Sequence, residues 1–337
     1  MRAILLAAAI GLVSAAQAAP LPDATYMHPG HLVPVDGARK INLVCLGHGS
    51  PTVLFDSGLA DSTVAWRLVQ GEVAKVTRAC AYDRAGIGFS DPRTAGESDA
   101  KAIVADLHAL LGSAKIKTPI LYVGHSIAGL YGLLLQATHP DDLAGVVLVD
   151  PSFANQFDAL WAASIAAGAK PAAGQAILDA LHAQTKRMKE CAKLKAPLPK
   201  DCAAADTRLP PALAAFHLAQ ESRPSYLITN ASEFESFLSQ GREKNADQKE
   251  LEAANANFGD KLLVVLTHGK GSSNPGMTDK QSAAMDRAWG AGHDKLAKLS
   301  TRGSNTVVPG SGHNIQHDQP QAVTDAVKKA VAALRAR

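Results

Sequence analysis

A serine stands between small residues where an apolar strand turns into a helix. The strand is expected at 120–123, the helix at 130–137, and the turn between them reads Gly124-His125-Ser126-Ile127-Ala128. Larger side chains two residues before and after such a serine would collide with the neighbouring strand and helix. The pattern therefore predicts that Ser126 projects from a strained turn as a nucleophile. A serine that merely caps the helix is the alternative interpretation.

A nucleophilic serine needs two further groups. An imidazole must take the proton of the hydroxyl, and a buried carboxylate must hold that imidazole in the right tautomer. Among twelve histidines, His313 follows the last expected strand through the turn-forming residues 309–312 and precedes the final helix. We therefore expect His313 to be the base. His125, inside the serine's own turn, is expected to pack beside the nucleophile.

An alternation of strands and helices must position these residues. Eight extended segments are expected, at 31–35, 41–46, 52–55, 79–82, 120–123, 145–149, 261–266 and 305–308. Several are unbroken apolar runs, which are typical of parallel strands buried on both faces. Helical spacing of apolar residues at 101–111 and 323–334 predicts covering helices. The sequence thus predicts an α/β protein with an eight-stranded, mostly parallel sheet covered by helices on both faces.

One long interval interrupts this alternation. Residues 152–257 are rich in alanine, helical in pattern and interrupted by prolines at 197, 199, 210 and 211. We interpret the interval as a helical insertion between two strands. The predicted organisation is a core formed by 19–151 and 258–337, with 152–257 inserted into it.

The first 18 residues predict a secretory signal peptide. They combine Arg2, an apolar run at 4–13 and the small-residue triplet 16–18. The run is shorter than the roughly 20 residues that a membrane-spanning helix needs, so a retained anchor is the weaker alternative and no membrane span is expected. We therefore expect a secreted or periplasmic protein.

The four cysteines predict disulfides, because an exported chain meets an oxidising compartment and no Cys-x-x-Cys pair is present. Cys191 and Cys202 share one polar segment, which favours a local loop between them. Cys45 and Cys80 lie in two expected strands that could be neighbours. Three connectivities remain possible in principle.

The mixed charges mark no nucleic-acid-binding surface, so no nucleic-acid partner is expected. The formal net charge is +3, and 34 basic and 31 acidic residues are interspersed along the chain rather than gathered in blocks. Glycine-rich segments at 86–88 and 269–272 lack the spacing of nucleotide-binding loops, and we expect turns there. No set of histidines with a suitable third ligand has metal-binding spacing, so no cofactor and no metal is predicted. The oligomeric state does not follow from the sequence.

Beyond these patterns, the chain resembles the α/β-hydrolase superfamily, specifically its capped esterase, C–C hydrolase and proline-iminopeptidase-like branch. The resemblance covers nearly the whole mature chain. It is carried, in order, by Phe55-Asp56-Ser57-Gly58-Leu59, Tyr82-Asp83-Arg84-Ala85-Gly86-Ile87-Gly88-Phe89-Ser90, the Ser126 turn, Val147-Leu148-Val149-Asp150-Pro151 and Pro309-Gly310-Ser311-Gly312-His313. It implies one antiparallel strand near the start of the sheet and a helical lid, or cap, after the sixth strand, which 152–257 matches. We expect the turn at 84–90 to be structural rather than catalytic.

The resemblance does not by itself identify the residue that serves as the catalytic acid. Most relatives place it after the seventh strand, where residues 267–274 contain no carboxylate. Some place it after the sixth strand, and there Asp150 ends the strand, so we choose Asp150. Such an Asp-Pro step can also simply close a strand. The rivals lie on or near a helix beginning around residue 278: Asp279, Asp286 and Asp294.

The resemblance also implies two backbone donors for a developing oxyanion. Residue by residue they are the N–H groups of Leu59 and Ile127. The predicted reaction is hydrolysis of a small-molecule ester through an acyl-enzyme on Ser126. Amide, peptide or carbon–carbon bond hydrolysis on the same residues is the first alternative, and a non-catalytic binding protein on a hydrolase scaffold is the second. The identity of the substrate does not follow.

Overall fold

The computed structural model describes residues 23–238, 244–273 and 276–336. The expected signal peptide, 1–18, lies outside these residues. Within the described part of the chain, no helix has both the length and the apolarity to cross a membrane.

All eight expected strands are present, in one sheet with the order β1-β2-β4-β3-β5-β6-β7-β8. The strands are β1 His31–Pro34, β2 Lys40–Leu46, β3 Val53–Asp56, β4 Ala79–Tyr82, β5 Ile120–His125, β6 Leu143–Val149, β7 Gly259–His268 and β8 Ser300–Val308. β2 runs antiparallel to β1 and β4, and all other neighbours are parallel. The prediction of a mostly parallel sheet with one antiparallel strand near its start is confirmed.

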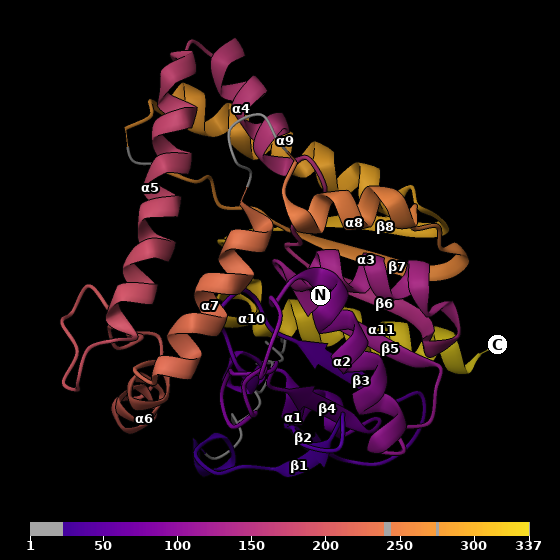
Figure 1. Ribbon diagram of the computed structural model, residues 1–337. Helices are drawn as coiled ribbons and strands as arrows, with labels where there is room; N and C mark the ends of the chain where they lie inside the picture. Colours follow the sequence, from indigo (N-terminus) through magenta and orange to yellow (C-terminus); the bar gives the residue numbers. More distant parts are fainter. Residues whose placement is uncertain (1–22, 239–243, 274–275, 337) are drawn as a thin grey trace, which may run out of the picture.

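Helices cover both faces of this sheet (Figure 1). They are α1 Gln70–Ala74, α2 Ala100–Ser113, α3 Ala128–Thr138, α4 Gln156–Ala166, α5 Pro171–Cys191, α6 Pro211–Glu221, α7 Pro224–Phe237, α8 Ala246–Ala254, α9 Asp279–Ala297, α10 Ile315–Asp318 and α11 Pro320–Arg335. The expected helices at 101–111, 130–137 and 323–334 are α2, α3 and α11. The helix expected near residue 278 is α9, and Thr278 is its N-cap.

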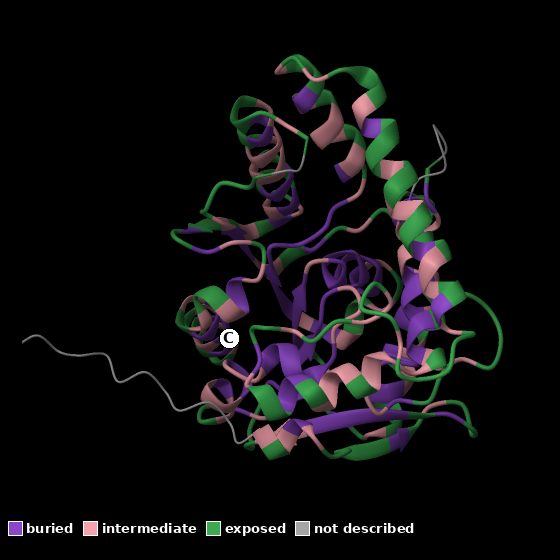
Figure 2. Cartoon of the chain, turned by 90° about the vertical axis from the view of Figure 1, so that its left-hand side faces the viewer, coloured by how far each residue is buried: buried purple, intermediate pink, exposed green. Residues whose placement is uncertain are grey.

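The core consists of two layers, one on each side of the sheet. Ile120 and Tyr122 of β5 pack with α2 and α3 on one face, whereas Leu121 and Val123 pack with α11 on the other. Both sets are buried because alternate side chains of a strand point to opposite faces. Figure 2 shows this concentration of buried residues along the sheet. Double coverage explains why β5 and β6 are apolar without alternation.

In the part of the chain that the structure describes, the helices α4 to α8 lie between β6 and β7. We refer to them as the inserted helices. α5, α6 and α7 each begin with a proline, whose missing N–H would have no helical acceptor at that position. The proline at 211 therefore starts a helix rather than only interrupting one. α5 packs on α7 and stands away from the sheet, with few buried residues (Figures 1 and 2).

The structure contains two disulfides, and both are among the expected pairings. Cys45 and Cys80 face each other in the register of β2 and β4, and their sulfurs are bonded. Cys191, at the end of α5, is bonded to Cys202 in the following loop. The first bond crosslinks two strands of the sheet, and the second closes a loop among the inserted helices.

Candidate active site

The turn after β5 places Ser126 at the carboxyl edge of the sheet. Ser126 has a φ of 54°, a left-handed conformation that is uncommon for residues other than glycine. Its backbone nitrogen donates to the carbonyl of Val149 at 3.1 Å, and its carbonyl accepts from the nitrogens of Gly129 and Ser152 at 2.9 and 2.8 Å. These bonds tie the turn to β6 and α3, which holds the strained residue in place.

The residues around this turn leave no room for larger side chains. A Cβ on Gly124 would lie 2.8 Å from the carbonyl oxygen of Ala128, and one on Gly129 would lie 2.5 Å from Cβ of Pro151. Ala128 itself is fully buried. Small residues were expected here because larger side chains would collide with the neighbouring strand and helix, and the observed packing agrees with that reason.

The structure brings Ser126, His313 and Asp150 into one hydrogen-bonded chain. Nε2 of His313 lies 2.9 Å from Oγ of Ser126, and Nδ1 lies 2.6 Å from Oδ2 of Asp150. His313 belongs to the loop between β8 and α10, and Asp150 directly follows β6. Their order and distances are those that a nucleophile, its base and an orienting acid require.

The three rival carboxylates lie elsewhere on α9. Asp294 accepts a hydrogen bond from Asn305 at 2.9 Å, and Asp286 accepts one from the backbone nitrogen of Ser272 at 2.8 Å. Asp279 is in the first turn of the helix, near its N-cap. Of the four candidate acids, Asp150 is the one that the structure places on His313.

Asp150 has partners that the sequence did not reveal. Oδ1 accepts from the backbone nitrogen of His268 at 3.0 Å and from Nε1 of Trp289 at 3.1 Å, and Oδ2 lies 2.9 Å from Nδ1 of His268. Burial alone would raise the pKa of Asp150, but hydrogen bonds from His268 and His313 outweigh it and hold that pKa below its ordinary value. Asp150 is therefore a carboxylate at neutral pH. It too has a left-handed backbone, with a φ of 44°.

His125 packs beside the serine, as expected. Burial lowers the pKa of His125 to about 3, so the ring is neutral near pH 7. Its Nε2 lies 3.0 Å from the carbonyl oxygen of His313, and because a carbonyl only accepts, Nε2 carries the proton and donates. His125 thus holds the backbone of His313 and is not poised to act as a base.

The loop after β3 packs directly against the serine turn. A Cβ on Gly58 would lie 2.7 Å from Nδ1 of His125 and 3.5 Å from Cβ of Ser126. The carbonyl oxygen of Gly58 accepts from Nη2 of Arg84 at 2.7 Å. In a trans peptide the N–H points opposite to the C=O, so the N–H of Leu59 is directed away from Arg84. Leu59 lines the same cavity as Ser126.

Arg84 is the centre of a buried charge network behind this loop. Its five N–H groups donate to Asp56, to the carbonyls of Ser57 and Gly58, and twice to Glu233 of α7, at 2.6 to 3.0 Å. The side chains of Arg84, Asp56 and Glu233 are at most 2% exposed. The motif at 84–90 was expected to be structural, and Arg84 supports the loop from the rear. Its pairing with Glu233 had no sequence signal.

A cavity of about 480 Å³ opens above the serine. Its floor includes Ser126, His313 and the loop at 58–61, and the inserted segment contributes Arg208, His217 and Glu221. Ile127, the other expected oxyanion donor, is the N-cap of α3, whose first N–H groups have no intrahelical acceptors. The cavity therefore brings Ser126, His313 and Leu59 together beneath polar side chains of the inserted segment.

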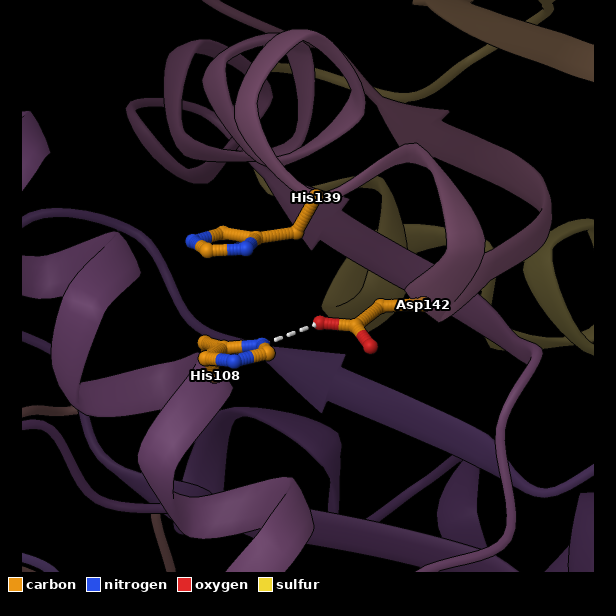
Figure 3. A group of neighbouring side chains, drawn as sticks. All are labelled: His108, His139 and Asp142. Atoms are coloured by element: carbon orange, nitrogen blue, oxygen red, sulfur yellow. Dashed lines mark hydrogen bonds and ion pairs between the residues drawn. The ribbon is translucent and has the colours of Figure 1, made fainter.

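A second cluster of polar side chains lies away from this cavity. His108, His139 and Asp142 have nitrogen and oxygen atoms within 4.8 Å of one another (Figure 3). The two rings are stacked 3.9 Å apart with an interplanar angle of 6°, and Nδ1 of His108 lies 2.7 Å from Oδ2 of Asp142. Imidazole lone pairs lie in the ring plane, so parallel stacked rings do not direct them at one ion. We therefore assign no coordination role to this cluster.

Comparisons with known proteins agree with this architecture. A model of the alpha/beta hydrolase family matches residues 43–326. The uncharacterized protein YqjL of Bacillus subtilis (strain 168) is 25% identical over 281 residues, covering 82% of this chain and 82% of that protein.

Two solved structures share the fold at low sequence identity. A mutant of a putative epoxide hydrolase from Pseudomonas aeruginosa has a TM-score of 0.62 and 15% identity, covering 94% of this chain and 99% of that one. A thermophilic esterase from Thermogutta terrifontis has a TM-score of 0.57 and 17% identity, covering 91% of this chain and 98% of that one. Because the family model spans most of the sequence, the chain belongs to the alpha/beta hydrolase family.

Proposed function

We propose that the protein is a serine hydrolase that cleaves carboxylic esters through an acyl-enzyme on Ser126. The observation that carries this proposal is the hydrogen-bonded chain from Ser126 to His313 at 2.9 Å and from His313 to Asp150 at 2.6 Å, at the floor of a cavity. A chain of this kind activates a hydroxyl that would otherwise be a weak nucleophile.

In the proposed reaction, Nε2 of His313 takes the proton of Ser126 as Oγ attacks the ester carbonyl. Asp150 stabilises the imidazolium that forms, and the N–H groups of Leu59 and Ile127 receive the negative charge on the carbonyl oxygen. The imidazolium then gives its proton to the departing alcohol, which leaves the acyl group on Ser126. A water molecule, deprotonated by His313, attacks the acyl-enzyme and releases the acid and free serine.

Family membership supports hydrolysis as the reaction class. The Thermogutta terrifontis structure is an esterase, and its likeness to this chain is one of fold. The putative epoxide hydrolase shares the fold in the same way. We favour acyl transfer over epoxide opening because a serine hydroxyl occupies the nucleophile position here, whereas epoxide hydrolases use an aspartate there.

We further propose that the inserted segment, 152–257, acts as a cap that selects substrates. Its residues Arg208, His217 and Glu221 contribute the polar side of the cavity. Polar side chains that line a cavity discriminate against substrates that cannot form hydrogen bonds with them, because such substrates leave these side chains unpaired.

We also propose that the protein works outside the cytoplasm. Two disulfides and the signal-like first 18 residues support this location.

A panel of chromogenic esters of increasing acyl length, with matching anilides, tests the proposal. We expect the wild type to hydrolyse esters faster than anilides and Ser126→Ala to lose turnover with both. Ser222→Ala is the matched control, because the Ser222 hydroxyl donates to the carbonyl of Leu218 at the end of α6 and Ser222 is not among the residues that line the cavity. Equal turnover by wild type and Ser126→Ala would contradict the proposal. Faster turnover of anilides than of esters would indicate that the protein hydrolyses amides in preference to esters.

A further inference from the structure

The carboxylate of Asp150 contacts a second imidazole besides that of His313. Its oxygens lie 3.0 and 2.9 Å from Nδ1 of His268, and Oδ1 also lies 3.0 Å from the backbone nitrogen of the same residue. On its other side, Oδ2 lies 2.6 Å from Nδ1 of His313. One buried carboxylate is thus shared by two histidines.

The sheet explains why His268 reaches this carboxylate. β6 and β7 are parallel neighbours, with Val149 opposite Leu266, so Asp150 and His268 leave the same edge. The His268 side chain is only 11% exposed. His268 ends β7, the strand after which most relatives place the acid, and residues 267–274 of this chain contain no carboxylate.

The charge of His268 depends on whether its Nε2 carries a proton. Because the ionised Asp150 carboxylate can only accept, Nδ1 of His268 keeps its proton in both charge states. Nε2 lies 3.7 Å from Oδ1 of Asp286 on α9. When Nε2 is also protonated, the cation bridges two carboxylates.

We propose that His268 is a positioning residue that acts through Asp150. In its neutral form it orients the carboxylate toward His313, and in its charged form it competes with His313 for the negative charge of that carboxylate. The inference rests on the proposed function, because it concerns the base of that reaction. In the transition state His313 becomes an imidazolium that Asp150 stabilises. A second cation on the same carboxylate weakens this stabilisation, so turnover falls as His268 takes up a proton.

The surroundings of His268 determine when it takes up that proton. Asp150 faces it from β6, Asp286 and His293 from α9, and His313 from the loop before α10. The hydrogen bond to Asp150 is the largest influence, and with the charge of Asp286 it raises the pKa of His268 against the opposing effect of burial. Burial lowers the pKa of His293, which disfavours a positive charge on that ring beside His268.

The pH profile of kcat/KM tests this proposal in the full-length protein, with a p-nitrophenyl ester as the probe. His268→Asn keeps an N–H donor near the position of Nδ1 but cannot become charged. We expect two protonations in the acid limb of the wild type, one of them at His268, and a single protonation in His268→Asn. Above the acid limb, kcat of His268→Asn should remain within about threefold of wild type, because the donor is retained.

Two further variants separate orientation from charge. His268→Ala removes the side-chain donor, and we expect kcat to fall about tenfold with KM unchanged, the effect of one hydrogen bond of ordinary net strength. Asp286→Asn removes one of the two carboxylates that favour the cation, so the His268 step should move to lower pH. Titration with a phosphonate measures the concentration of functional active sites in each preparation. Dividing the rate by this concentration prevents misfolded protein from lowering the apparent kcat.

An unchanged two-proton acid limb in His268→Asn, or a wild-type kcat in His268→Ala, would overturn the proposal. A readout independent of activity is the NMR titration of the ring signal that disappears in His268→Asn. Its midpoint should lie above that of an ordinary histidine and should decrease in Asp286→Asn. A midpoint that does not respond to Asp286→Asn would also overturn the proposal. Equal turnover by wild type and Ser126→Ala would instead remove the proposed function.

Discussion

At the scale of single residues, the site depends on two strained positions at the ends of adjacent strands. Ser126 and Asp150 both have left-handed backbones, and their backbone nitrogens donate to carbonyls of β6 and β7, which holds them there. The sequence predicted Ser126 from its small neighbours, His313 from its place after the last strand, and Asp150 because the position after the seventh strand lacked an acid. His268 and Trp289 were not predicted. Their contacts with Asp150 join residues 118 and 139 positions apart, for which the sequence has no pattern.

Asp150→Asn tests the assignment of the acid. The asparagine would occupy the same space but could not hold His313 in the tautomer that accepts the serine proton. We expect kcat to fall roughly ten-thousandfold with KM little changed. Asp294→Asn is the matched control, because the Asp294 carboxylate bonds Asn305 and does not contact His313. A large loss in Asp294→Asn, with a small one in Asp150→Asn, would contradict the assignment.

At the scale of elements, the inserted helix α8 stabilises the start of the core helix α2. Asp99 caps α2 through the backbone nitrogen of Ala102, whereas the nitrogens of Ala100 and Lys101 donate to carboxylates of α8 at 2.9 and 2.8 Å. These carboxyl oxygens satisfy N–H groups of the first helical turn that have no acceptor within the helix. The spacing of apolar residues predicted α2. The sequence did not predict its contacts with α8, because these contacts join residues about 150 positions apart.

Asp247 of α8 makes the stability of this junction depend on pH. Burial raises the pKa of Asp247 to about 7, even though Ala100 and Ser236 donate to the carboxylate. A raised pKa means that the folded state holds the proton more tightly than the unfolded chain. The stability contributed by the protonated form is therefore complete below about pH 4 and is lost as the pH rises through about 7.

Asp247→Asn removes this dependence. Between pH 4 and pH 8, the free energy of unfolding of the variant should rise relative to wild type by about 2–4 kcal/mol. Urea denaturation at a series of pH values measures the difference. Asp158→Asn, at an exposed position of α4, should follow the wild-type curve. A constant difference between Asp247→Asn and wild type across this range would contradict the interpretation.

At the scale of the whole molecule, the inserted helices are joined to the core behind the loop at 57–60. Glu233 of α7 binds Arg84, which in turn binds the loop carbonyls. Tyr226 of α7 adds a bond to the carbonyl of Ala60 at 2.7 Å. The alanine and proline content of 152–257 predicted a helical insertion. It did not predict which of its charged residues turn inward, because burial of Glu233 depends on how α7 packs against the core.

Glu233→Gln tests this junction. Losing one partner of a buried ion pair should lower the free energy of unfolding by about 3 kcal/mol, measured by urea denaturation at constant pH. Turnover should fall as well, because Arg84 positions the loop that carries Leu59. Glu235→Gln on the same helix is the matched control. Its carboxylate pairs with Lys189 at the surface, and its loss should change stability by less than about 1 kcal/mol. Equal effects of the two substitutions would contradict the role assigned to Glu233.

Ser126 is proposed to be a nucleophile that His313 activates. The most direct measurement is peptide mass spectrometry after reaction with a fluorophosphonate, applied to the wild type, Ser126→Ala and His313→Ala. We predict one phosphonyl adduct on Ser126 in the wild type, none in Ser126→Ala and strongly slowed labelling in His313→Ala. An unlabelled wild type, or an adduct on a different serine, would contradict the claim.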